Sequence, residues 1–227
     1  MRRVHVICEG QTEETFVNEV LRPHLTQEFR ILPIATLVGK PGHKGGAVTT
    51  SRMIADIGLR LLGDSDAWCT TFFDFYGLPA SFAGKQEAGR QMTSGRKAEA
   101  IQEALLRAVM RKTGANAVRR FIPYVQMHEF EGLLFSDPER LAAELYFPQA
   151  QADLEAIRFS FPTPEDINDS PLTAPGKRIL ALVPGYQKPL HGNLAAIGIG
   201  LDPIRRECPL FAGWLEKLEA LPALNDG

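Results

Sequence analysis

Acidic residues follow three of the strands predicted for this 227-residue chain, at the point where each strand ends. Glu9 follows the first strand, Asp74 follows the third, and Glu129 and Glu131 follow the fourth. Ligands of a parallel sheet bind outside the carboxyl ends of its strands, so we expect these side chains to meet in one pocket. Clustered carboxylates repel one another unless a cation neutralises them, and Mg²⁺ or Mn²⁺ takes oxygen ligands of this kind. The pattern predicts a metal-dependent catalytic site with ligands Glu9, Asp74, Glu129 and Glu131.

Each of these acids also has an ordinary structural interpretation when it is taken alone. A glutamate in the first turn of a helix is stabilised by the helix dipole, which would explain Glu13 and Glu131. An aspartate at the end of a strand is common in turns, which would explain Asp74. The metal interpretation is favoured because acids occur at three equivalent positions.

Three further residues are candidates for supporting roles at this site: Glu13, His128 and Glu165. His128 and Glu129 match the start of the zinc-binding HExxH motif, but no second histidine follows, so that motif is excluded. Glu165 belongs to an acidic loop with Asp166 and Asp169, and in one interpretation it approaches the metal. The alternative interpretation is a solvated loop with surface charges.

Basic residues that could neutralise a phosphate occur in two stretches of the chain. The candidates for phosphate binding are Lys85, Arg90, Lys177 and Lys188. The glycine-rich segment 39–46 lacks the Walker A pattern, and its Lys40, His43 and Lys44 form either a basic loop over phosphates or a plain flexible loop.

The elements expected to position these residues alternate between strand and helix. Apolar, β-rich runs predict strands over 4–8, 31–38, 67–73 and 120–127, and helical spacing predicts helices over 49–62 and 97–112. Thr12 is expected to be the N-cap of a helix that begins just after Glu9. This alternation predicts an α/β domain over residues 1–136, a parallel sheet of about four strands flanked by helices. Residues 137–227 are expected to form a helical C-terminal region packed on it.

Composition limits the classes of protein that the chain can be. The formal net charge is -2, which argues against a simple DNA-coating protein but not against a nuclease with a local basic groove. Cys8, Cys69 and Cys208 are too few and too far apart for a disulfide scaffold or a CxxC zinc site. The short apolar runs predict neither a signal peptide nor a membrane span, so we expect a cytoplasmic protein.

The strand that ends in Glu9-Gly10-Gln11-Thr12-Glu13 resembles the opening of Toprim domains, which occur in topoisomerases, primases and OLD-type nucleases. Toprim domains carry a second motif, D-x-D, at a later strand end. Here the matching strand gives Asp74-Phe75-Tyr76, so the second aspartate is absent. Across nearly its full length the chain resembles a bacterial family of uncharacterised Toprim-like proteins. The matching segments are EGQTEE, FFDFYGLP, HEFEGLLF, PEDIND and PGKRILALVPGYQK.

The resemblance implies a Mg²⁺- or Mn²⁺-dependent nuclease. Glu9 takes the place of the Toprim glutamate and Asp74 that of the first aspartate, and we expect Glu129 or Glu131 to supply the lost ligand. Members of the family are often encoded beside AAA-type ATPases in defence-like cassettes, which implies a possible ATPase partner and a role in anti-phage defence.

Three functions remain open on the sequence. The first is a magnesium-dependent endonuclease, or nuclease-like effector, that cleaves phosphodiester bonds in DNA or RNA. The alternative is a non-catalytic Toprim-like scaffold or regulatory subunit that binds a partner ATPase. A third, weaker option is another phosphoryl transfer on a nucleotide.

Overall fold

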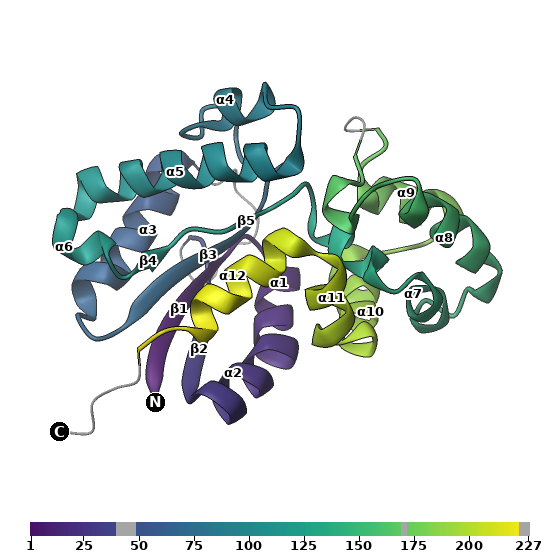
Figure 1. Cartoon of the computed structure of the whole chain (residues 1–227), viewed down its shortest axis with the longest axis horizontal. Helices are drawn as coiled ribbons and strands as arrows, with labels where there is room; N and C mark the ends of the chain where they lie inside the picture. The colour runs from purple at the N-terminus through teal and green to yellow at the C-terminus, as the bar shows by residue number, and fades with distance from the viewer. Residues whose placement is uncertain (40–48, 169–171, 223–227) are drawn as a thin grey trace.

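The computed structural model describes residues 1–39, 49–168 and 172–222. Its centre is a parallel sheet in which the strands lie in the order β2-β1-β3-β4 (Figure 1). The short strand β5 follows β4 along the chain and also pairs with β3. The strands are β1 (Arg2–Cys8), β2 (Ile31–Leu37), β3 (Trp68–Asp74), β4 (Phe121–Ile122) and β5 (Val125–Gln126). Helices flank this sheet, so the predicted α/β class is confirmed. Lys40, His43, Lys44 and Asp169 lie outside the described residues.

Helices fill the connections and most of the C-terminal half. In the first half they are α1 (Gln11–Phe16), the π-helical η1 (Val17–Leu21), α2 (Arg22–Phe29), α3 (Thr50–Gly63), α4 (Lys85–Gly89), α5 (Ser94–Thr113) and α6 (Ala115–Val118). The second half contains η2 (Phe130–Ser136), α7 (Pro138–Glu144), η3 (Pro148–Ala150), α8 (Gln151–Phe159), η4 (Pro164–Asp166), α9 (Pro175–Leu182), η5 (Lys188–Gly192), α10 (Asn193–Ile199), α11 (Leu201–Glu207) and α12 (Pro209–Glu219).

The predicted fourth strand is interrupted at Pro123. Proline has no backbone N–H and cannot continue a ladder of hydrogen bonds, so β4 ends before it and β5 begins after Tyr124. The side chain of Thr71 in β3 bridges the gap. Its Oγ1 accepts the Tyr124 N–H at 3.0 Å and donates to the Tyr124 carbonyl oxygen at 2.8 Å.

The sheet is covered on both faces, which explains why its central strands are almost continuously apolar. One hydrophobic cluster joins α3 and α5 to the sheet through residues such as Met53, Ile57 and Leu105. A second cluster, on the other face, includes Phe16 of α1 and Trp214 of α12. Figure 1 shows α12 returning across the sheet beside α1, although the two helices are far apart in the sequence.

The helices α7 to α11 gather at one end of the molecule (Figure 1). Helix α7 packs against α8 and α10, and α10 also contacts α1. Side chains of residues 137–227 and of residues 1–136 share one hydrophobic cluster. Within the described ranges, no helix is both long enough and apolar enough to cross a bilayer.

Candidate functional site

Glu9 and Asp74 meet where the two central strands end. Strands β1 and β3 are neighbours, with Cys8 paired to Phe72, so the residues that follow leave the sheet side by side. Glu9 Oε2 accepts the backbone N–H of Asp74 at 2.9 Å. The turn after β3 comes so close that a Cβ on Gly77 would overlap the Glu9 carboxylate, so a larger residue there would displace Glu9.

Glu13 joins the same region from the first helix. Gly10 is the N-cap of α1, so the expectation of Thr12 as N-cap was wrong. Glu13 Oε2 reaches back and accepts the Gly10 N–H at 2.9 Å, which ties the helix to the end of β1. Its other oxygen, Oε1, lies 3.5 Å from Lys188 Nζ.

The two glutamates after β5 have different positions. Glu131 is 3% exposed, and its Oε2 lies 3.3 Å from Lys188 Nζ. Glu129 Oε2 instead accepts the backbone N–H of Gly176 at 3.0 Å, in the first turn of α9. A Cβ on Gly176 would lie 3.0 Å from Glu131 Oε1 and 3.2 Å from Glu129 Oε2. Of the two expected ligands, Glu131 therefore joins the acids around Lys188, and Glu129 caps the start of α9.

Lys188, at the start of η5, lies among these acids. Its Nζ is 2.5 Å from Asp74 Oδ2, in addition to the contacts with Glu13 and Glu131. We call Glu9, Glu13, Asp74, Glu131 and Lys188 the acidic cluster. The sequence indicated Lys188 as a phosphate ligand, but it carried no signal for this contact because 114 residues separate Lys188 from Asp74.

Burial sets the protonation of the acidic cluster. Burial and then the charge of Asp74 raise the pKa of Glu9 to about 8, and the same causes raise the pKa of Glu13. Burial raises the pKa of Glu131 to about 7, against the attraction of Lys188. Burial opposes the charge of Lys188, but its carboxylate neighbours outweigh this effect and raise the pKa of its ammonium. The cluster therefore contains one permanent cation, and its Glu9 and Glu131 hold their protons to a higher pH than a free glutamate does.

The donor set suits a hard divalent cation. Asp74 Oδ1 and Glu131 Oε2 are buried and accept no hydrogen bond within the described part of the chain. In residues 1–39, 49–168 and 172–222, however, no three Asp, Glu, His or Cys side chains already stand in a metal-binding arrangement. Mg²⁺ is commonly held by one or two carboxylates, with water and phosphate completing its shell. The carboxylates of Glu9 and Asp74 match this requirement in number and in chemical type.

The other basic candidates lie outside the acidic cluster. The Lys85 ammonium donates to the Phe75 carbonyl oxygen and lies 3.7 Å from the centre of the Phe75 ring. Burial lowers the pKa of Lys85 to about 8, although the charge of Glu9 opposes this shift. Arg90 and Lys177 are exposed, at the end of α4 and in the first turn of α9.

His128 and Tyr76 pack behind the end of the sheet. His128 is buried, with Nε2 at 3.5 Å from Ser94 Oγ, and burial followed by the charge of Lys97 lowers its pKa to about 4. The Tyr76 ring lies 5.4 Å from the His128 ring. Tyr76 stands where a D-x-D motif would have its second aspartate, and its aromatic ring packs against His128.

Glu165 does not approach the acidic cluster. Its two carboxylate oxygens accept the backbone N–H groups of Leu210 at 2.7 Å and Phe211 at 2.9 Å, at the start of α12. The free N–H groups of a helix N-terminus favour a carboxylate at this position. The interpretation in which Glu165 approaches the metal is therefore wrong, and its role is to hold α12.

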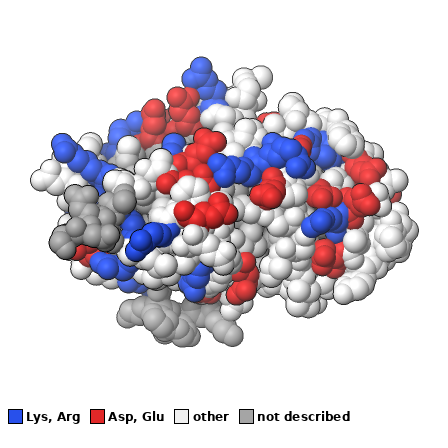
Figure 2. All heavy atoms as spheres, turned by 60° about the horizontal axis from the view of Figure 1, so that its bottom comes forward, with Lys and Arg blue, Asp and Glu red and all other residues white. Residues whose placement is uncertain are grey.

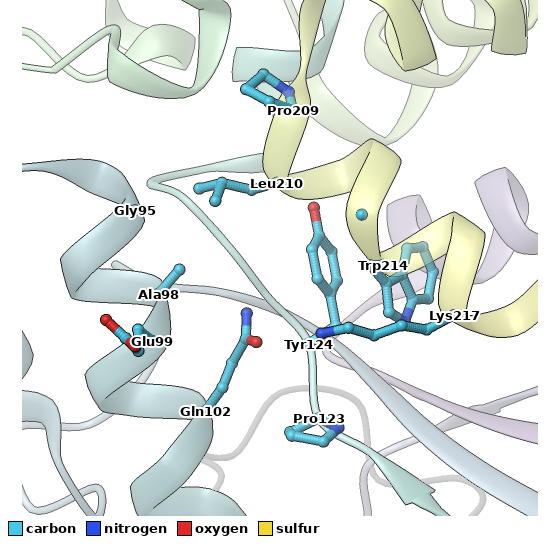
Figure 3. A pocket seen from close by; sticks show the side chains of 11 residues that line it. Gly95, Ala98, Glu99, Gln102, Pro123, Tyr124, Pro209, Leu210, Trp214 and Lys217 are labelled. Atoms are coloured by element: carbon cyan, nitrogen blue, oxygen red, sulfur yellow. The ribbon is translucent and has the colours of Figure 1, made fainter.

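Charges are mixed on one face of the molecule, and a pocket beside α12 contains none of the predicted site residues. On the face shown in Figure 2, Lys and Arg side chains are interspersed with Asp and Glu in small groups. A pocket of about 340 Å³ lies between α5, the Pro123–Tyr124 link and α12 (Figure 3). Glu99, Gln102 and Lys217 contribute its polar groups, and no residue of the acidic cluster lines it.

Comparison with known proteins gives one family. No curated protein and no solved structure matches the chain. Residues 8–219 match the family described as a domain of unknown function, DUF4276. This match spans nearly the whole chain, including every residue of the acidic cluster. The chain therefore belongs to the DUF4276 family.

Proposed function

We propose that this protein is a divalent-metal-dependent nuclease-like hydrolase that cleaves phosphodiester bonds in nucleic acid. The observation that carries the proposal is the convergence of Glu9 and Asp74 at the carboxyl ends of the two central strands. Ligands of parallel α/β sheets bind at this edge. The resemblance of the segment from Glu9 to Glu13 to the Toprim opening supports the same two residues.

The residues of the acidic cluster would have different roles in this reaction. Glu9 and Asp74 would hold Mg²⁺ or Mn²⁺, which supplies Lewis acidity to a phosphoryl oxygen. Glu13 and Glu131 orient Lys188 through their ion pairs. The Lys188 side chain is 32% exposed, so it would be accessible to a phosphate of the substrate.

The test is cleavage of nucleic acid by the purified full chain. Single- and double-stranded DNA and RNA are incubated with Mg²⁺, with Mn²⁺ or with a chelator. We expect metal-dependent cleavage that Glu9→Gln and Asp74→Asn each lower by about a hundredfold or more, since each removes a charge at the reacting centre. Glu99→Gln, an exposed acid on α5, serves as the matched control. Cleavage that survives in both variants, or in the chelator, contradicts the proposal.

A second candidate function is a non-catalytic scaffold that binds a partner protein, for which the AAA-type ATPase implied by the sequence resemblance is the candidate. Two observations favour it: Tyr76 stands in place of a carboxylate, and Lys188 already neutralises Asp74. Titration calorimetry separates the two functions. Binding of millimolar Mn²⁺ that Glu9→Gln abolishes supports the hydrolase, and absence of binding supports the scaffold.

A further inference from the structure

Lys188 forms ion pairs with carboxylates from three separate parts of the fold. Its Nζ lies 2.5 Å from Asp74 Oδ2 after β3, 3.3 Å from Glu131 Oε2 in η2 and 3.5 Å from Glu13 Oε1 in α1. These three acids are between 2% and 5% exposed. Loss of one partner of a buried ion pair leaves an uncompensated buried charge, which is strongly unfavourable. Lys188 is therefore part of the charge balance of the cluster.

Lys188 contacts only one of the two carboxylate oxygens of Asp74. Lys188 pairs with Oδ2, whereas Asp74 Oδ1 is buried and accepts no hydrogen bond in the part of the chain that the structure describes. Glu9 is the one acid of the cluster with which Lys188 forms no ion pair among the described residues, and Glu9 instead contacts the backbone of Asp74. Lys188 thus neutralises one oxygen of Asp74, and the other oxygen could bind a second cation.

The total charge of the acidic cluster limits how many divalent ions it can bind. If Glu9, Glu13, Asp74 and Glu131 all lose their protons when an ion binds, they carry four negative charges, and Lys188 with one divalent ion offsets three of them. A second divalent ion would turn a buried acidic cluster positive, which is unfavourable for buried charge without a compensating anion.

We infer that Lys188 is a built-in cation that restricts the acidic cluster to one divalent ion per chain. The inference rests on the proposed function, because it concerns the same site. Lys188 stabilises Glu13, Asp74 and Glu131 where another metal ion would otherwise bind, and Glu9 with Asp74 keeps the affinity for the single ion.

The experiment measures the number of Mn²⁺ ions bound to the full chain by titration calorimetry and by electron paramagnetic resonance. Wild type is expected to bind one ion and to give the spectrum of an isolated Mn²⁺. Lys188→Met removes the charge at similar length, and we expect a second ion and an exchange-coupled spectrum. Lys188→Arg keeps the charge and should bind one ion. Lys217→Met, an exposed lysine on α12, is the control for an unspecific loss of charge.

Two bound ions in wild type overturn the inference, even if Lys188→Met fails to fold. A folded Lys188→Met that stays at one ion at saturating Mn²⁺ also overturns it, and so does wild type that binds none. The result is separable from the proposed function. One bound ion without cleavage of any nucleic acid rejects the hydrolase and keeps the inference, whereas two bound ions with metal-dependent cleavage do the reverse.

Discussion

At the scale of single residues, the acidic cluster depends on close approach as much as on charge. Glu9 is held by the Asp74 N–H, and the exposed Gly77 lies directly against its carboxylate. Gly176 gives α9 the same close approach to Glu129 and Glu131. Glycines at these two positions therefore place acids that a side chain would displace.

Gly77→Ala should move Glu9 without unfolding the protein. The added Cβ would overlap the Glu9 carboxylate, so we expect the contact with Asp74 to break and Mn²⁺ affinity to fall by about tenfold to a hundredfold. Titration calorimetry measures the affinity, and thermal unfolding checks the fold. Gly89→Ala, where a Cβ meets nothing within 4 Å, is the control and should bind like wild type. Equal affinity in both variants would contradict the role given to Gly77.

At the scale of elements, carboxylates repeatedly hold the starts of helices. Glu13 reaches back to the N-cap of α1, Glu129 binds the first turn of α9, and Glu165 binds the first turn of α12. Free N–H groups at a helix N-terminus attract acids whether or not a catalytic site is near. Glu129 and Glu165 therefore have structural roles at helix starts, and the buried Glu165 fits neither the approach to a metal nor the solvated loop.

Glu165→Gln should change how stability depends on pH. Burial raises the pKa of Glu165 to about 7 from an ordinary 4.5, so the folded state holds its proton where the unfolded chain has lost it. The contribution of Glu165 to stability is therefore full below pH 4.5 and is lost as pH rises through about 7. A glutamine stays neutral, so between pH 5 and 8 we expect the variant to lose less stability than wild type, by roughly 1–3 kcal/mol.

Urea unfolding of both proteins at the two ends of that pH range measures this difference. Glu139→Gln, an exposed acid in the first turn of α7, is the control and should follow wild type at both values. If Glu165→Gln also follows wild type, the pKa of Glu165 is not raised in the folded protein.

At the scale of the whole molecule, α12 completes the hydrophobic core on one face of the sheet. Its Trp214 stacks on Tyr124, with ring centres 4.4 Å apart, and donates from Nε1 to Thr70 Oγ1 of β3 at 2.8 Å. Helix α12 is thus packed on the sheet formed by the first half of the chain. A protein built in this way should unfold as one unit, since the shared hydrophobic cluster cannot be opened in parts.

Trp214→Ala should lower the free energy of unfolding by about 3–5 kcal/mol, because it removes a buried aromatic side chain and its hydrogen bond. The variant keeps Trp68 as its one tryptophan, so Trp68 fluorescence reports on β3 while circular dichroism reports on the helices. We expect the two signals to change at the same denaturant concentration, and Trp214→Phe to be less destabilised. Separate transitions would mean that residues 137–227 unfold independently of the sheet.

The sequence alone determined the α/β class, the places where strands end, and the acids that follow them. Periodicity of apolar residues is local information, so it located β1, β2 and β3 to within a residue or two at either end. The fourth strand was extended too far, since the prediction did not weigh the missing N–H of Pro123 against the apolar run around it.

Only the tertiary structure decided which charged residues meet. Lys188 and Asp74 are 114 residues apart, and a local pattern cannot report a contact created by the packing of η5 against the end of the sheet. Glu129 and Glu131 are two residues apart, yet one caps α9 and the other pairs with Lys188. The direction of each side chain depends on which helix packs beside it. The packing of the whole chain determines which helix that is.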